Sequence, residues 1–205
     1  MSDQTSLSNV NPGTSLITPT PDVVRKYIWL FEQNDYAANT DKAIRHLVDA
    51  FPENVQIDEV LLKVTAINRL YSTNLYAVYP MAQHIVKLDI DTRIKEHDPE
   101  IVAEIANLQV GEKRRCFYSF ATKYCSWHAQ TGYPIYDSFV DQLLRFYRQR
   151  DGFAKFTNAE LWHYPTFRSV IQAFQRHYGL TEFSFKEIDK FLWIYGQEYN
   201  NQKRD

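Results

Sequence analysis

Hydrophobic residues recur along most of the chain at the spacing of an amphipathic α-helix. The clearest run has apolar side chains at positions 57, 60, 61, 64, 67, 70 and 71, which corresponds to a period near 3.6 residues. Similar stripes predict helices near residues 22–31, 40–51, 76–88, 99–108, 138–150, 166–178 and 185–199. Residues 113–128 are interpreted as a further helical segment, and no alternating stretch is long enough to predict a strand. The pattern therefore predicts an all-α protein.

The N-terminal stretch Met1–Pro21 lacks this pattern. It is rich in Ser, Thr, Asn and Pro and has few large apolar residues, so it cannot bury enough surface to offset its conformational entropy. We expect a flexible tail over residues 1–21. Residues 22–205 are expected to form a single helical domain, which two intertwined lobes could build.

Composition adds one informative feature, a high aromatic content. Of the 205 residues, 44% are hydrophobic and 15% are aromatic, and so many rings can fill a helical core or line a stacking pocket. The net charge of −2 excludes a basic protein overall, so nucleic-acid binding would require a local basic face. Between Glu112 and Arg150, seven basic residues outnumber three acidic ones. This excess predicts either such a face or an ordinary solvated helix surface.

Several classes of site find no support in the sequence. Cys116 and Cys125 alone make neither a disulfide framework nor a four-ligand zinc site. The chain has only 6 glycines, and none forms a phosphate-binding loop. No apolar run reaches the roughly 18 residues of a membrane span, and the N-terminus has no signal-peptide pattern. We therefore expect a cytoplasmic protein without membrane association, metal or cofactor.

The segment from Phe117 to Leu144 carries the most informative chemistry. Lys123 lies inside an aromatic-rich helical stretch, and burial among rings would lower the pKa of its amine and make it a nucleophile. The alternative is a lysine that extends its ammonium group to solvent from a buried helix. Asp137 directly precedes Ser138 and a hydrophobic helix, the position of a natural N-cap. A carboxylate at that place could also stabilise a developing cation.

This arrangement resembles the helix-hairpin-helix DNA glycosylase superfamily, the group that contains endonuclease III and 8-oxoguanine glycosylase. In that superfamily a hairpin leads into a helix with the catalytic lysine, and a hydrophobic-Asp-Thr/Ser/Val loop places an essential aspartate at the next helix start. Residues 120–123 correspond to the hairpin exit, residues 134–140 to the aspartate loop, and residues 66–74 to an early helix-turn whose polar side chains approach DNA. The sequence departs from the superfamily in a shorter lysine-to-aspartate interval of 14 positions and in lacking the hairpin glycines and iron–sulfur cysteines.

The resemblance implies a compact two-lobed helical fold and a DNA glycosylase activity, with an associated lyase step. Lys123 would be the nucleophile, and Asp137 would stabilise the sugar cation. Duplex DNA is the implied partner, and the implied DNA contacts are Lys113, Arg114, Arg115, Ser119, Thr122, Asn68, Ser72 and Asn74. The base extruded from the duplex would stack in a pocket formed by Tyr124, Trp127, His128 and Tyr133.

Two other functions remain consistent with the same residues. The chain could keep this scaffold without enzymatic activity and bind DNA, or it could be a helical protein-binding domain. The geometry of Lys123 and Asp137 separates the enzyme from these non-enzymatic alternatives. Both residues in one concave site favour the enzyme, whereas a solvent-facing Lys123 far from Asp137 favours a scaffold.

Overall fold

The computed structural model describes residues 16–202, and this range is predominantly helical, which confirms the all-α prediction at the level of fold class. The helices are α1 (Pro21–Gln33), α2 (Asp35–Ala50), α3 (Ile57–Leu70), α4 (Val78–Leu88), α5 (Asp91–Lys95), α6 (Glu100–Ala106), α7 (Tyr118–His128), α8 (Ser138–Asp151), α9 (Tyr164–His177) and α10 (Phe185–Gln202). A 3-10 turn, η1 (Ala159–Trp162), and a hairpin of β1 (Asn107–Val110) and β2 (Lys113–Cys116) complete the described elements.

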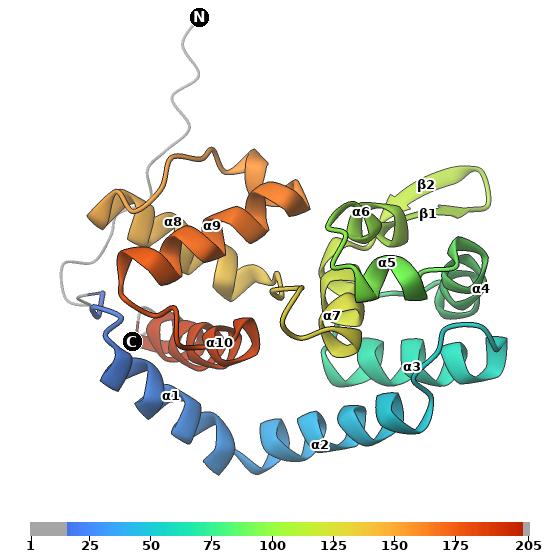
Figure 1. Ribbon diagram of the computed structural model, residues 1–205, viewed down its shortest axis with the longest axis horizontal. Coiled ribbons are helices and arrows are strands. Elements are labelled where there is room, and N and C mark those ends of the chain that lie inside the picture. The colour runs from blue at the N-terminus through green and yellow to red at the C-terminus, as the bar shows by residue number, and fades with distance from the viewer. Residues whose placement is uncertain (1–15, 203–205) are drawn as a thin grey trace, which may run out of the picture.

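The helices are arranged in two halves joined by α2 (Figure 1). One half contains α1, α8, α9 and α10, so both ends of the described chain lie in it, and α10 packs against α1 and α8. The other half contains α3 to α7 and the hairpin, with α3 against α4 and α7, and α6 against α7. Helix α2 contacts α1 in the first half and α3 and α7 in the second. Segments far apart in the sequence therefore meet along the boundary.

The expected N-terminal tail lies outside the described residues as far as residue 15. Residues 16–20 are attached to the first half. The Ile17 amide donates a hydrogen bond of 3.0 Å to the Tyr195 hydroxyl, and the Tyr147 hydroxyl donates one of 3.0 Å to the Ile17 carbonyl oxygen. Thr20 caps α1, which begins at Pro21. Residues 16–20, which the sequence assigned to the tail, are therefore packed against the domain.

The hairpin is the main departure from the predicted helices. The helix predicted over residues 99–108 ends at Ala106, and the segment interpreted as helical from residue 113 becomes helical only at Tyr118. Between them β1 and β2 pair antiparallel, with Val110 opposite Lys113. Gly111 makes the two-residue connection possible because its φ of +59° costs glycine little. A four-residue strand is too short to show a convincing alternation, so the sequence pattern missed it.

The loop between α7 and α8 is fixed by hydrogen bonds to its backbone. The Tyr136 amide donates to the Thr122 hydroxyl at 3.1 Å, and the Tyr164 hydroxyl donates to the Pro134 carbonyl oxygen at 2.9 Å. Thr122 lies on α7, so the first bond ties the end of the loop directly to that helix. Asp137, which follows Tyr136, is thereby held beside α7 as the N-cap of α8.

Candidate active site

A cavity of about 530 Å³ lies where the two halves meet. This volume falls within the range of about 300–1,000 Å³ that is typical of small-molecule and cofactor sites. Its walls come from α1, α2, the end of α3 and the following turn, α7, the start of α8, and α10. The lining residues are Phe31, Tyr36, Ala37, Thr40, Asp41, Leu70, Tyr71, Ser72, Thr73, Asn74, Ser119, Lys123, Ile135, Asp137, Ser138, Phe139, Lys186, Asp189 and Trp193.

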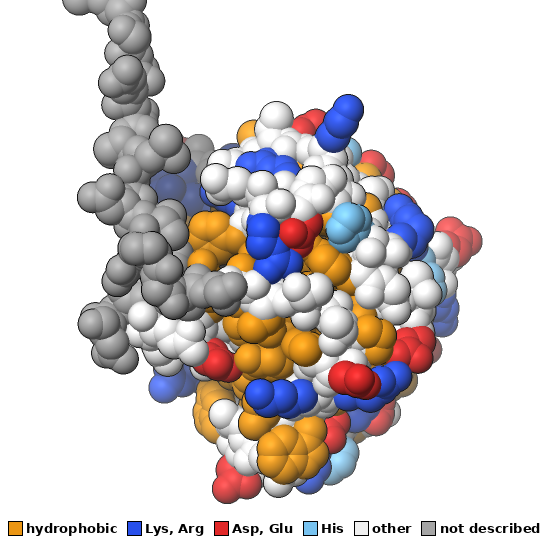
Figure 2. Space-filling view, turned by 90° about the vertical axis from the view of Figure 1, so that its left-hand side faces the viewer, with side chains coloured by type: hydrophobic (Ala, Val, Ile, Leu, Met, Phe, Trp, Pro, Cys, Tyr) orange, Lys and Arg blue, Asp and Glu red, His pale blue; other side chains and the backbone are white. Residues whose placement is uncertain are grey.

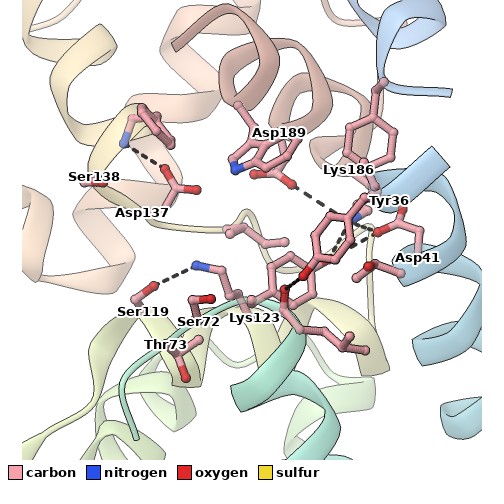
Figure 3. Close-up of a pocket in the computed structure, with 18 of the residues that line it drawn as sticks. Tyr36, Asp41, Ser72, Thr73, Ser119, Lys123, Asp137, Ser138, Lys186 and Asp189 are labelled. Carbon is pink, nitrogen blue, oxygen red and sulfur yellow. Dashed lines mark hydrogen bonds and ion pairs between the residues drawn. The ribbon is translucent and has the colours of Figure 1, made fainter. Parts of the chain in front are cut away.

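Lys123 projects from α7 into this cavity with only 3% of its surface exposed (Figure 3). Its Nζ donates to the Ser119 hydroxyl at 2.7 Å and to the Tyr136 carbonyl oxygen at 3.4 Å. Burial lowers the pKa of Lys123; Asp137 and Asp189 act in the opposite direction, and Lys186 adds to the lowering. Because its hydrogen-bond partners are uncharged, the site favours a neutral amine more than solvent does.

Asp137 lines the same cavity at the N-terminus of α8. Its Oδ1 accepts hydrogen bonds of 2.9 Å from the amides of Phe139 and Val140, which confirms the predicted N-cap. The positive end of a helix dipole stabilises a carboxylate at this position. Figure 3 shows Asp137 and Lys123 projecting into the same space from different helices. The structure therefore brings the two residues that the sequence singled out into one site.

A second lysine, Lys186 of α10, lines the opposite wall and is paired. Its Nζ donates to Oδ1 of Asp41 and to the Tyr71 hydroxyl, both at 3.1 Å, and lies 4.6 Å from the centre of the Trp127 ring. Burial by itself lowers the pKa of Lys186, but Tyr71, Asp189 and Asp41 outweigh it, so the pKa is raised. Lys186 is therefore held as an ammonium ion in the cavity wall, whereas the surroundings of Lys123 favour its neutral amine.

Asp189 follows Lys186 by one helical turn and is 8% exposed. Its Oδ2 lies 3.9 Å from the Lys186 Nζ, and its buried Oδ1 has no hydrogen-bond partner among the described residues. Burial raises the pKa of Asp189 to about 7, although Lys186 and Lys123 act in the opposite direction. Asp189 and Asp137 therefore lie in very different surroundings, since Asp137 accepts two backbone hydrogen bonds.

The predicted DNA contacts fall into three groups. Lys113, Arg114 and Arg115 lie exposed on β2, and Arg114 lines a groove together with His84 and Lys87. Ser72 and Asn74 are exposed at the cavity, and Ser119 lines it beside Lys123. Thr122 and Asn68 are not available as contacts. Thr122 is fully buried and holds the loop before Asp137, and Asn68 Oδ1 accepts hydrogen bonds from the Thr73 hydroxyl and the Leu75 amide.

The arginines of α8 do not join the basic strand β2. Figure 1 shows α8 and the hairpin in opposite halves of the molecule. Arg145 and Arg150 each pair with an aspartate at 2.6 Å, Asp141 and Asp151 respectively, and Arg148 donates to a backbone carbonyl. On the visible part of the face in Figure 2, basic and acidic side chains are mixed around a hydrophobic centre. Apart from the buried Lys123, the basic residues between positions 112 and 150 therefore belong to two surfaces, not to one face.

None of the four residues predicted to form the base pocket lines the cavity. Tyr124 and Tyr133 are fully buried in the core, and the Trp127 ring is 2% exposed beneath Lys186. His128 is buried enough that its pKa is lowered to about 3. The reason is that α2, α3 and α6 all pack against α7, so most aromatic side chains of α7 serve the core. The prediction of these residues as a base pocket is wrong.

The aromatic residues that do line the cavity come from other helices: Phe31, Tyr36, Tyr71, Phe139 and Trp193. Sequence reasoning also missed the cluster of Asp41, Lys186 and Asp189. One signal was available, because Lys186, Asp189 and Trp193 follow an i, i+3, i+7 spacing and hence share one face of α10. No local pattern connects that face to Asp41, which lies 145 positions before Lys186 in the chain.

Residues 16–202 contain neither a metal-binding cluster nor a membrane-spanning helix. No group of three His, Cys, Asp or Glu side chains in this range is arranged to hold a metal ion. In the same range, no helix has the length and hydropathy to cross a bilayer.

Comparison with known proteins places the chain in a family. A family model described as HI_0787_N, N-terminal domain, matches residues 23–132, a segment that includes Lys123 and ends before Asp137. A Haemophilus influenzae protein described as an uncharacterized protein is 41% identical over 143 residues, which are 69% of this chain and 68% of that protein. No solved structure matches the chain. By the extent of both matches, the chain belongs to the HI_0787_N family.

Proposed function

We propose that the protein is a base-excising enzyme that acts on DNA through Lys123. The observation that carries the proposal is the presence of a desolvated lysine and a helix-capping aspartate in one cavity between two halves of the molecule. This pair is the one that the resemblance to the helix-hairpin-helix DNA glycosylases singles out. Among the described residues, the Lys123 amine donates to uncharged groups, the Ser119 hydroxyl and the Tyr136 carbonyl oxygen, within a cavity wide enough to admit a ligand.

The chemistry follows from the two side chains. A base leaves its sugar through a transition state with oxocarbenium character, which the Asp137 carboxylate stabilises electrostatically. The neutral Lys123 amine attacks the anomeric carbon as the bond to the base breaks, and ring opening then gives a Schiff base. Lys186 is a poorer nucleophile, because its ammonium group is held by Asp41 and Tyr71.

The cavity also suits an extruded nucleotide. Enzymes that act on a base remove it from the stack and hold it between aromatic or apolar side chains. Tyr36, Phe139 and Trp193 take this role in the proposal in place of the four residues that the sequence suggested. The exposed strand β2 precedes α7, so Arg115 lies four positions before Ser119 of the cavity wall. Its basic side chains would contact phosphates near the extruded nucleotide.

The test is reductive trapping. The full-length protein is incubated with a labelled duplex that contains one abasic site, in the presence of borohydride, and the covalent adduct is mapped by mass spectrometry. We expect an adduct on Lys123 that is lost in Lys123→Ala and retained in Lys95→Ala, a matched change of an exposed lysine. An adduct on Lys186 would reject Lys123 as nucleophile. Duplex binding without any adduct would support the DNA-binding scaffold, and no binding at low salt would leave the protein-binding alternative.

A further inference from the structure

One carboxyl group of the cavity, that of Asp189, has no role in the reaction described above. Asp189 projects from α10 toward the space that Lys123 and Asp137 share (Figure 3). Neither of its oxygens takes part in a hydrogen bond among the described residues: Oδ1 has no partner, and Oδ2 lies 3.9 Å from the Lys186 Nζ. A buried carboxylate without hydrogen bonds is costly, so the fold favours the neutral acid at this position.

The titratable groups around Asp189 come from four other segments as well as its own helix. Lys186 of α10 and Lys123 of α7 favour its anion, whereas Asp137 of α8 and Asp41 of α2 disfavour it. Tyr71, at the end of α3, completes the surroundings through its bond with Lys186. Burial outweighs the two lysines and raises the pKa of Asp189 to about 7. Two carboxyl groups in one site with such different surroundings are the usual arrangement for a division of acid and base roles.

We propose that Asp189 is the proton-transfer residue of this cavity and delivers its proton to the group that leaves when Lys123 forms its covalent bond. This inference rests on the proposed function of Lys123. Asp137 is less suited to the task, because its Oδ1 is occupied by the amides of Phe139 and Val140. The Asp189 Oδ1 accepts no hydrogen bond within the described part of the protein, and Oδ2 has only the Lys186 ammonium at 3.9 Å, so the carboxyl group can hold a proton on Oδ1 without breaking a hydrogen bond.

The step can be written for an abasic site. The Lys123 amine adds to the sugar aldehyde, its nitrogen–carbon bond forms, and a proton moves from nitrogen to the aldehyde oxygen to give a carbinolamine. The carbon–oxygen bond then breaks, the oxygen takes the Asp189 proton and departs as water, and the nitrogen lone pair forms the protonated Schiff base. Asp189 is left as a carboxylate. With an intact nucleotide, the same proton would go to the departing base.

The experiment measures single-turnover trapping on the abasic duplex as a function of pH. The wild-type rate should fall at low pH as Lys123 becomes protonated, and should fall again above about pH 7 as Asp189 loses its proton. Asp189→Asn should be slower by about 100-fold near pH 6.5, within the range known for general acid catalysis, and should lack the alkaline fall. Asp41→Asn is the matched control, since it changes another carboxyl of the same wall, and it should keep the alkaline fall.

Two outcomes overturn the inference. In the first, Asp189→Asn traps the abasic duplex as fast as wild type. In the second, its trapping rate is lower by the same factor at every pH, which indicates a structural role. If the wild-type protein forms no adduct, the Schiff-base chemistry fails. Infrared difference spectra of wild type and Asp189→Asn without DNA then decide about Asp189 separately. A protonated carboxyl signal at pH 6 that disappears by pH 8 supports the assignment, and an ionised carboxylate at both values rejects it.

Discussion

Gly196 of α10 lies directly against Phe139 of α8. A Cβ atom built at Gly196 would be only 2.6 Å from the Phe139 Cβ, well inside van der Waals contact. The glycine therefore allows α10, which carries Lys186 and Asp189, to approach the first turn of α8 next to Asp137. Phe139 also lines the cavity, so this close approach of two helices lies at the edge of the candidate site.

Gly196→Ala should consequently lower stability even though alanine is the better helix former by about 1 kcal/mol. The expected loss is about 1–3 kcal/mol, because the added methyl group overpacks the contact with Phe139. Urea unfolding measures the change. Asn201→Ala, on the exposed end of the same helix, serves as the control and should change stability by about 0.5 kcal/mol or less. A stabilised Gly196→Ala protein would show that the two helices are not held at this distance.

Lys63 should be essential for stability. It is fully buried in α3, and its Nζ donates to the carbonyl oxygens of Phe51 and Glu53 at 2.9 and 2.6 Å and to Oδ1 of Asn54 at 2.8 Å. Lys63→Met keeps much of the volume but removes the donor to the carbonyl oxygens of Phe51 and Glu53, while Asn54 Oδ1 keeps only its bond from the Tyr124 hydroxyl. We therefore expect a loss of about 3 kcal/mol or more. Thermal and urea unfolding test this. Lys42→Met, at an exposed position of α2, should have little effect.

The free energy of unfolding should depend on pH through the titration of Asp189. Its pKa is raised to about 7 in the folded state, from an ordinary value near 4, so between these values the folded state binds more protons than the unfolded state. Stability contributed by the neutral acid is therefore lost as the pH rises from about 4 to 7. Asp189→Asn should be more stable than wild type at pH 8, by a few kcal/mol at most, with the difference shrinking toward pH 4. Urea unfolding at several pH values measures it, and a difference that does not vary with pH would contradict the prediction.

Asp137→Asn should slow base release while leaving the stability of the protein nearly unchanged. Asparagine is as good an N-cap as aspartate, so the amides of Phe139 and Val140 keep an acceptor, and stability should change by about 1 kcal/mol or less. The loss of the carboxylate charge should slow base release on the order of 100-fold. Duplex affinity should remain close to wild type in a gel-shift assay. A variant with full activity would remove Asp137 from the proposed mechanism.

The basic strand β2 should contribute to DNA affinity without sequence preference. Arg114 and Arg115 are exposed, and phosphate contacts carry no base information. Replacing both by alanine should weaken duplex binding to a similar degree for unrelated sequences and should reduce the slope of log affinity against log salt by about 1.8, since each phosphate contact contributes about 0.9. Lys95→Ala, an exposed lysine on α5, is the control. An unchanged salt slope would place the DNA contacts elsewhere.

The sequence by itself determined the helical class and the local features of the candidate site. Hydrophobic spacing located most of the helices, and the position of Asp137 before a hydrophobic helix predicted its role as N-cap, which its hydrogen bonds to Phe139 and Val140 confirm. These features depend on residues a few positions apart, and so a linear pattern contains them. The Lys123–Asp137 pair could be selected for the same reason, because one short loop joins the two helices.

Only the tertiary structure decided which side chains surround that pair. Tyr124, Trp127 and Tyr133 looked suitable for a stacking pocket. The packing of α2, α3 and α6 around α7 places the first two in the core, and Tyr133 is buried against Tyr164 of α9. The cavity wall is completed instead by side chains of α1, α2 and α10, which approach α7 because α2 spans both halves. Asp189 lies 66 positions from Lys123, and its burial and the resulting rise of its pKa arise from that assembly. Periodicity identifies the buried face of each helix, whereas the neighbour on that face depends on how all the helices pack together.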